Sequence, residues 1–245
     1  AGSRIILWLV SDTPESKGLP SVQKLSGEEV TKEDTMPTKE LQKFVIRHPG
    51  IWVIAISSAF IYITKYAIAG WGVLFLQKAR GFSLEDASQI IAFSAIFGIV
   101  GTVLAGWLSD KVFNSDRVKP AILSGIVSFI ALALFLFTEG GYIVNILYVS
   151  LFSLAVGVLY CIVAGLMAVD IVPRKATGAA LGVVGISSYI AAGLQDITSG
   201  YLIQYNTVNV NGTYVYDFMP VSWFWLAAAL ISFLLPVLNW KRLKR

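Results

Sequence analysis

The stretch from Ile51 to Leu76 reads IWVIAISSAFIYITKYAIAGWGVLFL and contains one charged residue, Lys65. A helix of about 20 mostly apolar residues is long enough to cross the hydrocarbon core of a bilayer. A membrane-spanning β-strand has only about 10 residues, in which polar and apolar side chains alternate. This stretch is longer and continuously apolar, so it predicts a transmembrane helix.

Five further apolar runs follow along the chain. They are Gln89–Leu108, Pro120–Thr138, Tyr142–Val172, Ala176–Ile203 and Val221–Trp240. Of the 245 residues, 56% are hydrophobic and 14% are charged, whereas about 25% of the residues in a soluble domain are charged. The single cysteine excludes a disulfide framework. The sequence therefore predicts an all-α membrane protein, with a bundle of six transmembrane helices over residues 50–245.

The residues before this bundle divide into two parts. Residues 1–10 are apolar, and we expect them to form the end of a preceding transmembrane helix. The chain begins Ala1-Gly2-Ser3 without a methionine, so we expect a fragment of a longer protein. A signal peptide is the alternative, but no small-residue cleavage pattern follows. Residues 11–49 are polar and predict a linker with one surface helix near Thr38–Arg47.

Lysine and arginine are distributed unevenly between the two sides of the predicted bundle. Fifteen lie in the linker, in the loops after the second and fourth helices and at the C-terminus, whereas Lys78 and Arg80 lie on the other side. Basic residues accumulate in cytoplasmic loops. We therefore expect the linker and a short C-terminal tail to be cytoplasmic. This topology accounts for the net charge of +4, so no nucleic-acid partner is expected.

Lys65 is the first candidate functional residue. It lies fourteen residues after Ile51, which is about 21 Å along a helix and near the middle of a bilayer. Tyr62, Tyr66 and Ala69 share its helix face at spacings of three and four residues. An ionisable group at this depth is costly and usually marks a functional site. The face is therefore expected to point at a water-filled cavity or another helix.

An alternative is that Lys65 extends its side chain outward to the membrane surface. If the helix ends near Trp71, only about six residues separate the two positions, and a lysine side chain can cover most of that distance. A break of the helix at Gly70 or Gly72 would favour this alternative.

Two tyrosines are expected at the same depth as Lys65. Tyr160 lies thirteen residues before Pro173, and Tyr189 lies thirteen residues after Ala176, so each is about 20 Å along its helix. Each tyrosine alone is explained by a hydrogen bond to a neighbouring helix. Together with Lys65 they predict a site for an anion, with one fixed positive charge and hydroxyl donors around it.

A second charged residue, Asp196, lies twenty residues into the Ala176–Ile203 run. It can pair with a cation outside this chain, couple to protons, or lie close to the outer surface, and the sequence leaves these alternatives open. Glycines recur in two of the predicted helices and indicate close helix packing. They are Gly98, Gly101 and Gly106 in the second helix, and Gly178, Gly182, Gly185 and Gly193 in the fifth.

The loop after the second helix reads Gly106-Trp107-Leu108-Ser109-Asp110-Lys111 and continues to Arg117. The glycine allows two helices to approach, the aspartate can cap the following turn, and the basic residues can bind headgroups or the carboxylate. The loop resembles the cytoplasmic signature between the second and third spans of each half of major facilitator transporters. The resemblance implies a structural and gating role for Gly106, Asp110, Lys111 and Arg117.

A second motif narrows the resemblance. The string Asp12-Thr13-Pro14-Glu15-Ser16-Lys17-Gly18-Leu19-Pro20 resembles the start of the central linker in the organophosphate:phosphate antiporters. That family comprises glycerol-3-phosphate and hexose-phosphate transporters and a related hexose-phosphate sensor. The resemblance covers nearly the whole chain. It implies the C-terminal half of a two-bundle fold in a bacterial inner membrane, with an N-terminal six-helix bundle as its partner.

The resemblance also implies an activity and a site. The protein would exchange an organic phosphate for inorganic phosphate by alternating access. The family's basic position maps onto Lys65, and Tyr62, Tyr160 and Tyr189 match cavity tyrosines, so these four residues are candidates for substrate binding. Many bacterial members carry arginine where this chain has Lys65. Lysine keeps the charge but lacks the planar, bidentate donor geometry, so phosphate remains the expected ligand while the particular substrate stays open.

Two other functions remain as alternatives. A membrane receptor of the same fold would bind a sugar phosphate and signal to a kinase, and a non-transporting scaffold would place Lys65 at the membrane surface. No phosphate-binding glycine-rich loop, nucleophile–base pair or cluster of metal ligands stands out in the sequence. We therefore expect neither an enzyme nor a cofactor nor a metal site.

Overall fold

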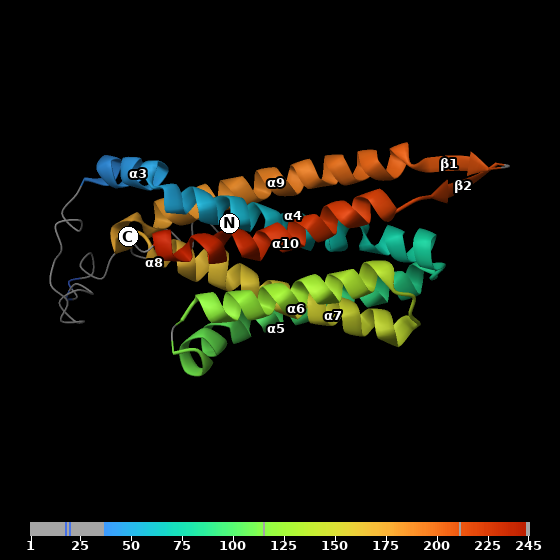
Figure 1. The fold of residues 1–245 in the computed structure, drawn as a ribbon, viewed down its shortest axis with the longest axis horizontal. Helices are drawn as coiled ribbons and strands as arrows, with labels where there is room; N and C mark the ends of the chain where they lie inside the picture. Colours follow the sequence, from blue (N-terminus) through green and yellow to red (C-terminus); the bar gives the residue numbers. More distant parts are fainter. Residues whose placement is uncertain (1–17, 19, 21–36, 115, 211, 244–245) are drawn as a thin grey trace.

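The computed structural model describes residues 18, 20, 37–114, 116–210 and 212–243. Six long helices lie side by side in one bundle (Figure 1). They are α4 (Pro49–Arg80), α5 (Leu84–Trp107), α6 (Val118–Phe137), α7 (Tyr142–Tyr160), α9 (Thr177–Tyr205) and α10 (Met219–Leu243). Each is long and apolar enough to cross a membrane. The prediction of six membrane-spanning helices is confirmed.

Two of these helices continue in a wider turn. The end of α5 passes into a π-helical segment at Leu108–Val112, and α7 passes through another at Cys161–Met167 into the short helix α8 (Ala168–Asp170). A single 3₁₀ turn, Arg174–Ala176, leads into α9. Segments of π-helix inside an α-helix are rare, and those that do occur are often found at functional sites.

Helices α4 and α5 begin before the predicted runs, because capping groups and not hydropathy fix their ends. Helix α4 begins at Pro49, since proline is suited to the first turn. It ends where Gly81 takes a left-handed conformation with φ of 72°. Helix α5 begins five residues before the predicted run, because the Ser83 side chain accepts a hydrogen bond from the backbone N–H of Asp86.

The predicted surface helix is present as α3 (Thr38–Arg47). Its Leu41 and Val45 are buried against Ile51 and the start of α9. The preceding helix expected at residues 1–10 lies outside the described residues, as does most of the expected linker at residues 11–49.

One element was not predicted. Strands β1 (Thr207–Val210) and β2 (Thr213–Tyr216) form an antiparallel hairpin between α9 and α10, with Val208 opposite Val215. The hairpin extends beyond one end of the bundle (Figure 1). Its turn is closed at Gly212, whose φ of 82° suits glycine.

Glycines bring α5 and α7 into backbone contact. A Cβ atom at Gly101 would lie 2.1 Å from the carbonyl oxygen of Leu154, and one at Gly157 would lie 2.4 Å from that of Gly98. The predicted close packing is thus present at Gly98 and Gly101. No neighbouring atom of the described residues lies within 4 Å of a Cβ at Gly106, Gly178, Gly182, Gly185 or Gly193, so close packing at these glycines stays a prediction.

Serine hydroxyls join α4 to α9. The hydroxyls of Ser58 and Ser188 lie 2.7 Å apart, and Ser187 donates a hydrogen bond to the backbone oxygen of Ala55 at 3.1 Å. These contacts fix the two helices in the register that brings Tyr189 next to the middle of α4. Hydrogen bonds between buried hydroxyls tie helices together in an apolar setting.

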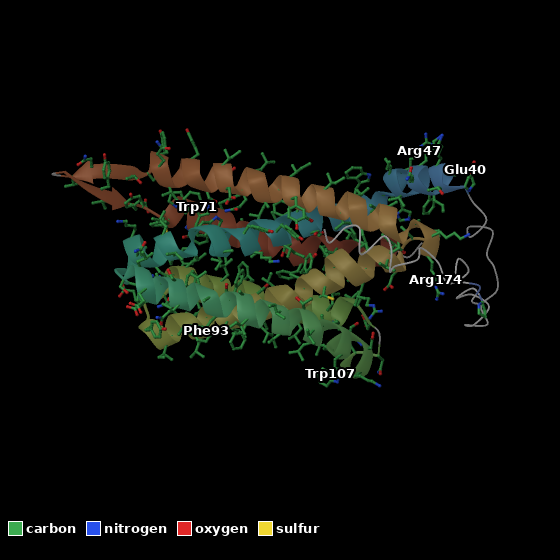
Figure 2. The ribbon with its side chains drawn as sticks, turned by 180° about the vertical axis from the view of Figure 1, so that it is seen from behind. Glu40, Arg47, Trp71, Phe93, Trp107 and Arg174 are labelled. Atoms are coloured by element: carbon green, nitrogen blue, oxygen red, sulfur yellow. The ribbon has the colours of Figure 1, made fainter. Side chains whose placement is uncertain are left out.

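Helices α5 and α9 are the least buried of the six within the described part of the chain. Their outward sides carry large apolar residues, and Phe93 and Trp107 project from α5 away from the bundle (Figure 2). Exposed apolar surface of this extent indicates contact with lipid or with other protein.

Candidate functional site

Lys65 lies at the midpoint of α4 and points at aromatic rings. Its Nζ atom is 5.6 Å from the centroid of the Tyr62 ring, 5.9 Å from that of Tyr66 and 5.4 Å from that of Tyr160. An ammonium within about 6 Å of an aromatic face is attracted by the ring's electrons. Helix α4 continues without interruption through Gly70 and Gly72 to Arg80, so the helix break that would favour an outward Lys65 is absent.

The predicted layer of tyrosines is formed across three helices. The Tyr62 hydroxyl donates a hydrogen bond to that of Tyr160 at 3.3 Å. The rings of Tyr62 and Tyr189 meet edge to face with centroids 5.4 Å apart. The exposed fraction is 6% for Tyr62 and 63% for Tyr189. Tyr62 is therefore the buried centre of this cluster, while Tyr189 covers it on the side of α9.

A cavity of about 360 Å³ opens between α4, α5 and α7 beside Lys65. Ligand pockets start at about 300 Å³. Lys65 and Tyr160 line the cavity, whereas Tyr62 and Tyr189 do not. The sequence analysis missed three further hydroxyl residues of the wall, Ser94, Thr102 and Ser153. Serine and threonine are common in transmembrane helices, so nothing in the sequence distinguished these three from packing residues.

The charge of Lys65 is not neutralised by the residues that the structure describes. Their ion pairs join Arg117 to Asp110 and Asp170, and Lys119 to Asp116. A cation that faces a cavity without a carboxylate partner favours an anionic ligand there. Among these same residues, no group of three or more His, Cys, Asp or Glu side chains is placed to hold a metal ion.

Asp196 is an exposed residue of α9 and lies next to Gly70 and Trp71 of α4. Its Oδ1 atom accepts a hydrogen bond from the Trp71 indole at 3.3 Å and faces Gly70, where a Cβ atom would lie 3.5 Å away. Trp71 is visible on α4 in Figure 2. Asp196 forms no ion pair with a described residue. The alternatives for Asp196, an outside cation, proton coupling or a position near the outer surface, therefore all stay open.

Arg117 organises the signature loop. Its guanidinium donates to Asp110 at 2.8 Å, to Ser109 at 2.6 Å and to Asp170 at 3.2 Å. These bonds join the end of α5 to the start of α6 and to α8. Burial alone would lower the pKa of Arg117, but the hydrogen bonds to Asp110 and Asp170 outweigh it and raise that pKa above its ordinary value. The arginine therefore stays charged and holds both carboxylates.

The other residues of the loop have different surroundings. At the start of α6, Asp116 accepts the hydrogen bond from the backbone N–H of Val118 at 2.9 Å. That Asp110 caps the turn after it stays a prediction. Asp110 is engaged with Arg117. Lys111 is exposed. Gly106 has no neighbour of another helix within 4 Å among the described residues, so its role in a close helix contact stays a prediction.

Replacing Arg117 tests this arrangement. In Arg117→Gln both carboxylates lose their cationic partner, and we expect amide hydrogen exchange in Leu108–Val118 to rise roughly fivefold, since a partly exposed ion pair contributes about 1 kcal/mol. Lys111→Gln is the matched control, because it removes one positive charge from the same loop and should leave exchange within twofold. Equal amide hydrogen exchange in Arg117→Gln and in the original chain would contradict the conclusion that Arg117 holds this loop together.

Comparison with known proteins identifies the family of the chain. A profile described as Major Facilitator Superfamily matches residues 3–195. A glycerol-3-phosphate transporter of Bacillus subtilis (strain 168) is 32% identical over 222 residues, which cover 87% of this chain and 49% of the relative. A hexose-6-phosphate:phosphate antiporter of Escherichia coli (strain K12) is 35% identical over 192 residues, which cover 74% and 40%.

A third relative has a different activity in its name. The membrane sensor protein UhpC of Escherichia coli (strain K12) is 27% identical over 205 residues, which cover 77% of this chain and 44% of the relative. The chain thus spans about half the length of the curated relatives it matches. With six helices and a profile match over most of its length, the chain belongs to the major facilitator superfamily, in the family of organophosphate:phosphate antiporters.

Proposed function

We propose that this chain forms the C-terminal bundle of an antiporter that exchanges an organic phosphate, such as a sugar phosphate or glycerol-3-phosphate, for inorganic phosphate by alternating access. The observation that carries the proposal is the ammonium of Lys65. It lies at the midpoint of a membrane-spanning helix and faces a cavity, and no described carboxylate pairs with it. Transporters of this kind bind their substrates near the bilayer midplane.

The surroundings of Lys65 suit a phosphate group. A phosphate carries up to two negative charges at neutral pH, and its attraction to an ammonium is several times stronger in a cavity of low polarity than in water. The Tyr160 hydroxyl lines the same cavity and can donate to a phosphate oxygen. The ammonium of lysine acts as a point charge and does not orient the phosphate as a planar guanidinium would. The hydroxyl groups must therefore orient the phosphate.

The exposed apolar sides of α5 and α9 are evidence that a second bundle packs against this one. These helices border the site, and their apolar outward faces would be covered when the N-terminal six-helix bundle closes the cavity. Rocking of the two bundles about the site would then expose it to each side of the membrane in turn. The fifteen basic residues that the sequence assigns to one side of the membrane support a bacterial inner-membrane location with a cytoplasmic C-terminus.

A sensor is the second candidate, because two relatives are named membrane sensor proteins at 27% and 28% identity. The same fold and the same cation serve either activity, so the structure of this half does not separate them. A sensor would bind the phosphate ester without moving it across the membrane.

A counterflow assay distinguishes an antiporter from a sensor. Proteoliposomes that contain the full-length protein are loaded with inorganic phosphate, and labelled glycerol-3-phosphate or glucose 6-phosphate is added outside. An antiporter accumulates the label only when phosphate is present inside. Saturable binding of the same compound without accumulation would overturn the transport proposal and favour the sensor. Absence of both binding and flux for every phosphate ester would overturn both.

A further inference from the structure

A separate positively charged surface lies on α3, away from the cavity. Lys39, Lys43 and Arg47 are spaced four residues apart and are all exposed, so they form one stripe along the helix. The opposite side of α3 is apolar, and its Leu41 and Val45 are buried against the bundle. The stripe therefore faces away from the protein, as Figure 2 shows for Arg47 at the end of the bundle.

The stripe borders a hollow where α3 meets α4. The hollow has a volume of about 530 Å³ and is lined by Lys43 and Arg47 together with Glu40, Phe44, His48 and Pro49. The first turn of α4 contains no acidic residue and has no side-chain cap. Glu40 also lines the hollow, and the two cations Lys43 and Arg47 outnumber this one carboxylate.

Apolar groups lie next to these cations at the start of the membrane-spanning helix. Phe44, Ile46 and Trp52 are exposed, and the Trp52 indole donates a hydrogen bond to the backbone oxygen of Ile46 at 2.8 Å. Tryptophan is enriched at the level of the lipid headgroups. The surface thus combines basic groups with apolar ones at the membrane boundary, which is the combination that binds charged lipids.

We propose that the hollow between α3 and α4 binds the phosphate group of an anionic phospholipid in the adjoining leaflet. Lys43 and Arg47 contact the phosphate, and Phe44 and Trp52 lie against the glycerol and the upper acyl chain. A free phosphate ion would use the cations but would leave these apolar side chains exposed. The site is independent of Lys65 and of whether the protein transports or senses its substrate.

The test uses the full-length protein in nanodiscs or detergent with phosphatidylglycerol or phosphatidylcholine, and measures retained lipid by native mass spectrometry. We expect a preference for phosphatidylglycerol that falls about fivefold for each charge removed in Lys43→Gln and Arg47→Gln. The swapped variant Lys43→Arg/Arg47→Lys should retain the preference. Lys39→Gln is the matched control, because it removes a charge from the same stripe outside the hollow, and it should stay within twofold.

Three results would overturn the lipid site. The first is an equal effect of Lys39→Gln and Lys43→Gln, which would indicate a diffuse charge effect. The second is displacement of phosphatidylglycerol by excess inorganic phosphate, which would indicate a site for the free ion. The third is an unchanged lipid preference in the variant Lys43→Gln/Arg47→Gln together with weakened association of the two bundles, which would assign the surface to a protein contact.

Discussion

Lys65→Ala is expected to reduce phosphate counterflow about 100-fold or more, while Lys65→Arg retains a measurable rate. Lys65 is exposed within this half of the fold, and in the proposed complex it forms a charge pair with the phosphate between the two bundles. Removing one member of such an enclosed pair costs about 2–5 kcal/mol, and each 1.4 kcal/mol corresponds to a factor of ten. The loss follows because the described part of the cavity wall offers no other basic side chain to replace this charge. Arginine keeps the charge and adds a bidentate donor, so it should preserve binding.

The controls separate the charge from the shape of the site. Lys65→Met keeps most of the side-chain volume and should lose exchange as fully as Lys65→Ala. Tyr189→Phe keeps the ring against Tyr62 and should reduce the rate far less. Each variant is first shown to be folded by its elution profile and thermal stability. Exchange at the original rate in a folded Lys65→Ala protein would remove Lys65 from the site and leave the phosphate proposal without its main support.

Gly101→Ala is expected to destabilise the bundle strongly, although it adds only one methyl group. Its Cβ atom would lie 2.1 Å from the backbone oxygen of Leu154 and 2.9 Å from the carbonyl carbon. Backbone atoms cannot move aside as a side chain can, so α5 and α7 must separate. Overpacking typically costs about 1–3 kcal/mol and sometimes more, which corresponds to a fall in Tm of roughly 6–12 °C at the upper end.

Gly98→Ala is the matched control, since Gly98 lies one turn earlier on the same helix. Its Cβ atom would be 3.9 Å from the backbone oxygen of Ser153, which is ordinary contact. The same substitution there should leave Tm unchanged or raise it slightly, because alanine favours the helix more than glycine. Equal Tm values for the two variants, measured in the same detergent, would show that α5 and α7 are not held in backbone contact at Gly101.

Much of the architecture followed from sequence because its causes are local. A transmembrane run is defined by its own length and polarity, and the spacing within one helix places Tyr62 and Lys65 on a shared face. Equal depth also brought Tyr160 and Tyr189 into the layer of Lys65, because helices in a bilayer run nearly parallel. These arguments need only the rise per residue and the positions of the helix ends.

The angular arrangement of the helices could not be obtained in this way. Depth does not reveal which side of a helix a residue occupies, so Tyr62 was expected in the cavity and instead lies buried beside it. Ser94 and Ser153 became visible as wall residues only when α5 and α7 were placed. The same limit explains the glycines: Gly98 and Gly101 of α5 meet α7, while Gly178, Gly182, Gly185 and Gly193 of α9 have no neighbour of this kind among the described residues.

The π-helical segment at Cys161–Met167 has a consequence for comparing this chain with its relatives. Hydrogen bonds there span five residues instead of four, so the segment accommodates more chain per turn than the helix on either side. One residue more or less rotates everything beyond it by about 100°. An alignment gap between this protein and a relative with a regular helix belongs inside Cys161–Met167. The residue equivalent to Tyr160 is then found by counting forward from Tyr142, not backward from Pro173.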